Sequence, residues 1–299
     1  MPASKQTWNW KKILRWAGTL ASLGLFVYLL ARQNWPQLWQ ALSRLPVWAV
    51  GLAFSLYLSG QAANALRWWI LLRSQKVTIS YLQALQLIFA GAFASNFLPS
   101  TIGGDALRML GLFQYTTQRV MAVASVLLDR ILNVLAYVTV APFALGVALP
   151  QDLTILGFFI TLPGWLRRIL DKLLEAFRLW RQQPAALIRA FGVSWLSIFV
   201  IFLALFTLAR GLGIPVALHQ VIGINVVTYF LTLLPISVNG YGVREIAITG
   251  LYIQVGATLE QAAALAIISR LMLMAETLPG ALWAPRLLPA DKPSSDVVL

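Results

Sequence analysis

Long apolar runs constrain this chain more than any other feature. Trp16–Ala31, Val47–Leu66 and Ala185–Leu208 approach or exceed the roughly 18 to 20 residues that a helix needs to cross a bilayer. Charged residues make up only 11% of the 299 residues, whereas soluble domains carry roughly 25%. We therefore predict an all-α polytopic membrane protein in which residues 1–299 form one transmembrane domain.

The positions of the basic residues predict the orientation of the chain. Lysine and arginine are enriched on the cytoplasmic side of membrane proteins. With the basic N-terminus inside, 16 of the 23 lysines and arginines lie inside, 3 outside and 4 within the membrane. Both termini are then cytoplasmic, at the cytoplasmic (inner) membrane, and the first run is an uncleaved helix rather than a signal peptide. This asymmetry accounts for the net charge of +13 without a nucleic-acid partner.

We expect roughly six full spans and two hairpins made of broken helices. In chain order the expected elements are Trp16–Ala31; a helix on the outer surface, Trp35–Leu45; Val47–Leu66; a hairpin of Tyr81–Leu98 and Ala106–Tyr115; Met121–Leu145; Leu153–Leu166; a basic cytoplasmic surface stretch, Leu166–Arg181; Ala185–Leu208; a broken stretch, Val221–Val255; and a last helix from Thr258. Capping-box spacings at Ser80 and Gln83 and at Thr258 and Gln261 mark the starts of the first hairpin and of the last helix.

The breaks of the two hairpins share a sequence pattern. "NFLPSTIGGDALR" (Asn96–Arg108) and "LLPISVNGYGVRE" (Leu233–Glu245) both contain P-x4-G-x3-R. Because the order of elements also recurs with opposite sidedness, we predict two inverted-topology repeats, about 12–150 and 151–286, followed by a short polar tail, 287–299. Such repeats place a binding site near the midplane between the halves. The alternative is that both breaks are ordinary surface loops between full spans.

Eight charged residues lie within the predicted membrane segments. A charge at the centre of a membrane helix costs about 2.5 to 3.5 kcal/mol on insertion scales, so we expect these residues to converge. Neighbours on a helix do not face each other, and adjacent charges therefore need partners on other helices. The eight are Asp105, Arg108, Asp129, Arg130, Arg244, Glu245, Arg270 and Glu276. The alternative is that they form ion pairs that merely fix helix packing, with Asp105 as a helix cap.

These residues favour binding over catalysis. Arginines at helix breaks offer charge-assisted donors to an anionic head group. Backbone amides that would add to them belong to Gly103, Gly104, Asn239 and Gly240. The sequence has no GxSxG, HExxH or P-loop motif, so we expect neither enzymatic activity nor a cofactor. With no cysteine and one histidine we expect no metal site either. Tryptophans expected as anchors at the membrane interface include Trp68, Trp69 and Trp195.

Three motifs taken together resemble a known family. "NFLPSTIGGDALR", "LLDRILN" and "LPISVNGYGVREI" are similar to signatures of the lysylphosphatidylglycerol synthase transmembrane family, a flippase-type membrane domain found alone or fused to an aminoacyl-lipid synthase. The resemblance covers about Trp16 to Arg286 and implies a stand-alone member without the synthase domain. It implies translocation of modified phospholipids or isoprenoid lipids. The functional residues it implies are Asn96, Pro99, Gly103, Gly104, Asp105, Arg108, Asp129, Arg130, Pro235, Asn239, Gly240, Gly242, Arg244 and Glu245.

Our leading hypothesis is a translocase that moves an anionic or zwitterionic phospholipid, or an isoprenoid-linked lipid, across the cytoplasmic membrane. The head group would be held by Arg108, Arg130, Arg244 and Arg270, and Glu276 completes the candidate site. Movement would be passive or coupled to an ion, through rocking of the two halves. The alternative is a non-transporting scaffold or accessory subunit for a lipid-modifying or glycosyl-transferring enzyme, docked through Leu166–Arg181. A small-solute or ion transporter is a third hypothesis.

Overall fold

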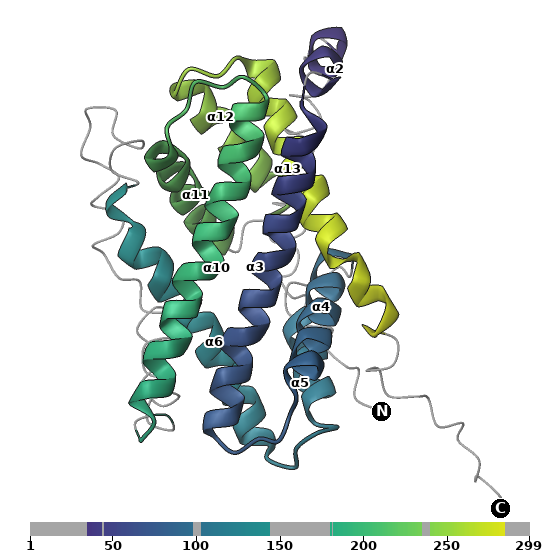
Figure 1. Cartoon of the computed structure of the whole chain (residues 1–299), viewed down its shortest axis with the longest axis vertical. Coiled ribbons are helices and arrows are strands. Elements are labelled where there is room, and N and C mark those ends of the chain that lie inside the picture. The colour runs from purple at the N-terminus through teal and green to yellow at the C-terminus, as the bar shows by residue number, and fades with distance from the viewer. Residues whose placement is uncertain are drawn as a thin grey trace, which may run out of the picture. The chain divides into compact units, whose positions relative to one another are not determined.

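Helices account for every regular element in the part of the chain that the structure describes (Figure 1). The computed structural model describes residues 35–43, 45–97, 103–143, 180, 182–234 and 240–284. Its helices are α2 (Trp35–Ser43), α3 (Val47–Ser74), α4 (Tyr81–Phe97), α5 (Gly103–Leu112), α6 (Arg119–Val140), α10 (Pro184–Gly211), α11 (Leu218–Leu233), α12 (Val243–Gln254), α13 (Leu259–Thr277) and the 3₁₀ helix η2 (Leu278–Leu282). The predicted all-α class is therefore confirmed for these residues. The predicted elements Trp16–Ala31 and Leu153–Leu166, and all of Leu166–Arg181 except Trp180, lie outside the described residues.

Several of these helices are suited to a bilayer. Among the described residues α6, α10 and the continuous stretch Leu259–Leu282 are long and apolar enough to cross a membrane. The helix α3 is long enough by length alone: its 28 residues extend about 42 Å at 1.5 Å per residue, which exceeds the roughly 30 Å hydrocarbon core. The chain is thus a helical membrane protein, as predicted.

Side-chain caps define where two helices begin. At the start of α4, the backbone N–H of Ser80 donates to the side chain of Gln83 at 2.8 Å, and the N–H of Gln83 donates to the Ser80 hydroxyl at 3.2 Å. The same reciprocal pair joins Thr258 and Gln261 before α13, at 3.0 and 3.2 Å. Both predicted capping boxes are confirmed. They satisfy backbone donors that a helix start would otherwise leave unpaired.

Each predicted hairpin corresponds to a pair of packed helices, α4 with α5 and α11 with α12. In the first pair the backbones come so close that a Cβ atom on Gly104 would overlap the carbonyl oxygen of Gly91 and the hydroxyl of Ser95. Glycine is therefore required at this contact. The segments that join the arms, 98–102 and 235–239, include Pro99, Pro235 and Asn239 and lie outside the described residues.

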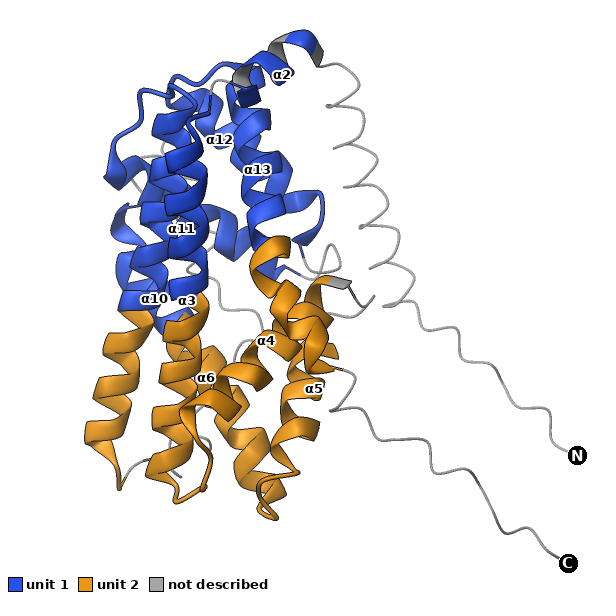
Figure 2. Ribbon diagram, turned by 45° about the vertical axis from the view of Figure 1, so that its right-hand side comes forward, with its two compact units in different colours: residues 1–60, 134–164, 196–273 blue, residues 61–133, 165–195, 274–299 orange. Residues whose placement is uncertain are grey.

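The helices fall into two compact units, which Figure 2 distinguishes by colour. Unit 1 is drawn from residues 1–60, 134–164 and 196–273, and unit 2 from residues 61–133, 165–195 and 274–299. The core of unit 1 includes the fully buried side chains of Tyr57, Leu205 and Tyr252. Unit 2 has apolar cores around Trp68 and around Trp180. Segments from both halves of the sequence therefore build each unit.

The same order of helices occurs twice along the chain. The helices α3 and α10 both have 28 residues, and α10 starts 137 residues after α3 (184 against 47). The helix α11 also starts 137 residues after α4 (218 against 81). The next two helices, α12 and α13, each start 140 residues after α5 and α6 (243 against 103, 259 against 119). The long, hairpin, hairpin, long order thus recurs with nearly constant spacing.

Candidate functional site

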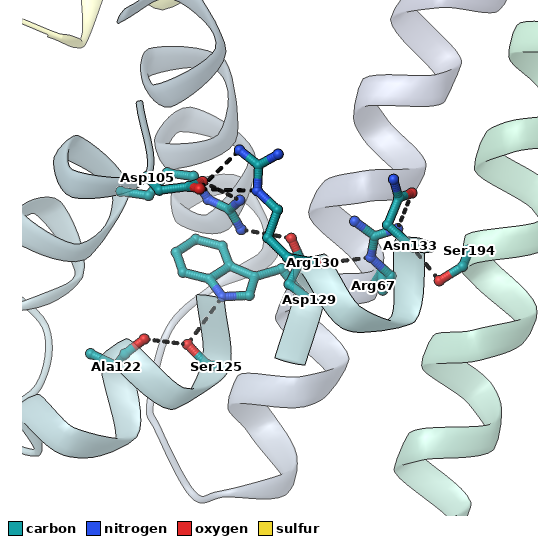
Figure 3. Close-up of polar contacts among 10 residues, drawn as sticks. Arg67, Asp105, Ala122, Ser125, Asp129, Arg130, Asn133 and Ser194 are labelled. Carbon is teal, nitrogen blue, oxygen red and sulfur yellow. Dashed lines mark hydrogen bonds and ion pairs between the residues drawn. The ribbon is translucent and has the colours of Figure 1, made fainter. Parts of the chain in front are cut away.

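Five charged side chains of unit 2 form one chain of ion pairs with alternating sign (Figure 3). Asp129 accepts a hydrogen bond from Arg67 Nε at 2.7 Å and from Arg108 Nη2 at 3.1 Å. Asp105 lies 3.5 Å from Arg108 Nη1 and 2.9 Å from Arg130 Nη2. We call Arg67, Asp105, Arg108, Asp129 and Arg130 the unit 2 network. Three guanidinium groups and two carboxylates leave it with one excess positive charge.

Helix geometry explains why the network draws on three helices. Asp129 and Arg130 are adjacent on α6, so their side chains diverge by about 100°. Asp129 contacts Arg67 from α3 and Arg108 from α5, whereas Arg130 contacts Asp105 at the first turn of α5. The prediction that neighbouring charges find partners on other helices is confirmed here.

The two ends of the network differ in exposure. The side chains of Arg67 and Asp129 are 5% and 3% exposed, and Arg67 Nη1 also donates to Asn133 at 3.0 Å and to Ser194 at 3.4 Å. In contrast, the Arg130 side chain is 58% exposed. The network is therefore closed at Arg67 and accessible at Arg130.

Arg108 lies against the ring of Trp68, with its guanidinium carbon 4.4 Å from the ring centroid. The indole N–H of Trp68 donates to Ser125 at 3.2 Å, which orients the ring. Among the described residues, Arg108 Nε has no hydrogen-bond partner. Trp68 is fully buried, so the prediction that it anchors the membrane interface is wrong.

Sequence reasoning also missed Arg67. The predicted span Val47–Leu66 ends one residue before Arg67, whereas α3 continues to Ser74 and places Arg67 inside the helix. The signal that could have identified it is the apolar run Trp68–Leu72, which directly follows the arginine.

A second cluster lies in unit 1 and centres on Arg270. Its Nε donates to Glu245, its Nη2 donates to the carbonyl of Gly240 at 3.4 Å, and the guanidinium carbon lies 4.5 Å from the ring centroid of Tyr241. The other carboxylate oxygen of Glu245 accepts from the N–H of Gly242 at 2.8 Å. Gly240 and Gly242 have φ of +70° and +80°, which favours glycine at both positions.

Arg244 belongs to the same unit and contacts α13 at a different residue. Its Nη1 donates to the hydroxyl of Ser269 at 3.1 Å. Adjacent charges on α12, Arg244 and Glu245, therefore both find partners on α13, as predicted.

The two clusters repeat one ion pair at the same spacing. Asp105 and Arg130 are 25 residues apart, and so are Glu245 and Arg270. Each acid lies in the first turn of the second hairpin helix, and each arginine donates through Nε from the helix that follows. The ion pairs follow the 140-residue spacing of these helices.

The other candidate residues have different surroundings. Glu276 accepts from the Gln61 side chain at 3.1 Å within unit 2, so it does not belong to the cluster of Glu245 and Arg270 in unit 1. The side chain of Asn96 donates to Thr277 at 3.1 Å, also within unit 2. Gly103 is the first residue of α5.

Comparison with known families identifies a membrane protein family. A family profile described as the lysylphosphatidylglycerol synthase TM region matches residues 15–280. The chain belongs to this family. The predicted family membership is confirmed, and both charged clusters lie within the matched residues. Searches of curated proteins and of solved structures gave no match.

Proposed function

We propose that this member of the lysylphosphatidylglycerol synthase transmembrane family is a lipid translocase of the cytoplasmic membrane that is not an enzyme. The observation that supports the proposal is the unit 2 network. It has one excess positive charge, and its exposed member is the guanidinium of Arg130. An intramembrane ionisable cluster is expensive and usually serves function. A guanidinium suits the phosphate of an anionic or zwitterionic lipid, because it donates two parallel hydrogen bonds.

The geometry allows Arg130 to change partners at low cost. Its guanidinium forms an ion pair with Asp105. When Arg130 binds a head group instead, Asp105 remains paired with Arg108, because Arg108 Nη1 lies 3.5 Å from the Asp105 oxygen that Arg130 does not contact. No carboxylate is then left unpaired, and an unpaired buried charge is what makes breaking an ion pair costly.

Two inverted repeats would provide the change of access that translocation requires. The recurring helix order and the recurring ion pair support this part of the proposal. The chain also enters the units in opposite order: α3 begins in unit 1 and ends in unit 2, whereas α10 begins in unit 2 and ends in unit 1. That reversal is what inversion of a repeat would produce.

The proposal is tested by reconstituting the purified chain in phosphatidylcholine vesicles that contain fluorescent phosphatidylglycerol. Quenching from outside measures exchange between leaflets. We expect exchange by the wild type, about tenfold slower exchange by Arg130→Gln, and unchanged exchange by Arg119→Gln, an exposed arginine on the same helix. Equal rates for all three would disprove the role of Arg130, and no exchange by the wild type would disprove the translocase.

A further inference from the structure

Arg244 differs from the other arginines of the two clusters in how its charge is matched. Arg67, Arg108, Arg130 and Arg270 each pair with a carboxylate. Among the described residues, Arg244 pairs with none and makes a single hydrogen bond, to Ser269. A guanidinium has five N–H donors, so most of its donor capacity is available.

The surroundings of Arg244 include the hydroxyl groups of three tyrosines. Tyr57, Tyr137 and Tyr252 interact electrostatically with its guanidinium. Arg244 and Tyr252 both lie on α12, eight residues apart, and both belong to unit 1. Glu245 also interacts electrostatically with Arg244, but its carboxylate accepts the hydrogen bond of Arg270.

The second observation concerns the buried hydroxyl group of Tyr252. Its side chain is 0% exposed, and its hydroxyl has no hydrogen-bond partner among the described residues. A buried hydroxyl without a partner is destabilising, whereas phenylalanine would fill the same space without that cost. A ligand oxygen that accepts from this hydroxyl would explain why the polar group is there.

We propose that Arg244 and Tyr252 form a phosphate-binding subsite in unit 1, with Ser269 orienting Arg244. The inference rests on the proposed function in one respect: it takes the phosphate to be that of a lipid head group. The hydroxyl of Ser269 accepts from Arg244 and donates to the carbonyl of Ala266 at 3.1 Å, so its hydrogen is already used within the protein. The donors left for a ligand are the remaining N–H groups of Arg244 and the Tyr252 hydroxyl, which suit an anion with several acceptor oxygens.

The test is a binding titration of the full chain in dodecyl maltoside, which contains no phosphate. Three ligands are added separately: phosphatidylglycerol, a diglucosyl diacylglycerol without phosphate, and inorganic phosphate. Native mass spectrometry measures occupancy. We expect phosphatidylglycerol to bind most tightly and Arg244→Gln to weaken it about tenfold, the loss typical of a hydrogen bond to a charged group. Arg244→Lys keeps the charge and should recover part of the affinity.

Tyr252→Phe provides a readout that a purely structural role would not give. Because the hydroxyl has no partner among the described residues, its removal should leave the melting temperature unchanged or higher while phosphatidylglycerol binding falls severalfold. The matched control is Tyr81→Phe in unit 2, whose hydroxyl donates to the carbonyl of Ala62 at 3.1 Å. That variant should melt lower and bind as the wild type does.

Several outcomes would overturn the subsite. These are unchanged phosphatidylglycerol affinity in both Arg244→Gln and Arg244→Lys, a lower melting temperature with unchanged affinity in Tyr252→Phe, and equal binding of the phosphate-free glycolipid. Inorganic phosphate binding as tightly as phosphatidylglycerol would contradict a lipid source. The vesicle assay distinguishes the two proposals. If the wild type exchanges lipid between leaflets but Arg244→Gln binds phosphatidylglycerol normally, only the subsite is disproved. If Arg244→Gln binds phosphatidylglycerol more weakly but the wild type exchanges no lipid, only the translocase is disproved.

Discussion

Asp129 is the residue on which the unit 2 network most depends, since it accepts hydrogen bonds from two buried arginines. Replacing it by asparagine keeps the shape but leaves Arg67 and Arg108 without their shared counter-charge. Removing one partner of a buried ion pair typically costs about 3 to 5 kcal/mol. We expect a loss of this order in Asp129→Asn, measured as thermal unfolding in detergent by tryptophan fluorescence.

Arg130→Gln is the matched control for that prediction. It also removes one member of an ion pair in the network, but its side chain is largely exposed. Exposed pairs contribute about 0.2 to 1 kcal/mol, so this variant should unfold close to the wild type. Asp129→Asn unfolding at the same temperature as Arg130→Gln would show that burial does not set the strength of the network.

The sequence could identify charged residues in the membrane but not their partners. Hydropathy locates Asp129 and Arg130 in an apolar run, and helix geometry requires that they point apart. Which helices receive them depends on packing between segments far apart in the chain, and this cannot be read from periodicity. Arg67 was missed for a related reason, because an arginine that follows an apolar run looks like the end of a span.

At the scale of elements, α4 and α5 come into close contact at Gly104. A methyl group at Gly104 would meet the backbone of Gly91 and the side chain of Ser95, so the two helices must separate to accept it. Overpacking of this kind typically costs about 1 to 3 kcal/mol. We expect Gly104→Ala to lower thermal stability by that amount in the same unfolding assay.

Gly250→Ala is the control at this scale. Gly250 is also helical, but a Cβ atom there would have open space within 4 Å. Alanine favours a helix over glycine by about 0.5 to 1 kcal/mol, so this variant should be as stable as the wild type or slightly more stable. Destabilisation of both variants to the same extent would mean that the contact at Gly104 has no special role.

Element boundaries were predicted best where a local signal marks them. The capping box at Ser80 fixed the start of α4, and the helix runs to Phe97, the last described residue before the segment that joins the two arms. The second arm was predicted from Ala106 but begins at Gly103. Gly103 and Gly104 were interpreted as part of the break because glycine disfavours helices, whereas here the first turn needs glycine for close packing.

At the scale of the whole molecule, the two 28-residue helices pass through the two units in opposite order. From N- to C-terminus, α3 begins in unit 1 and α10 begins in unit 2. From the sequence, opposite orientation of the two halves was indicated only by the order of the elements and by the uneven distribution of lysine and arginine. Neither of these reveals that segments from both halves of the chain build each unit, because that depends on contacts between distant residues.

Inverted topology makes a prediction that single cysteines can test, because the natural chain has none. Thr78 and Thr117 lie in the loops that follow α3 and α5. Ala217 lies in the loop that follows α10, and Gln254 is the last residue of α12; all four are exposed. By the positive-inside rule, we expect an impermeant maleimide added to intact cells to label cysteine at Ala217 and Gln254, and to label Thr78 and Thr117 only after the cells are opened. Labelling of all four from one side would mean that the two sets of helices run in the same direction, and alternating access by inverted repeats would then be excluded.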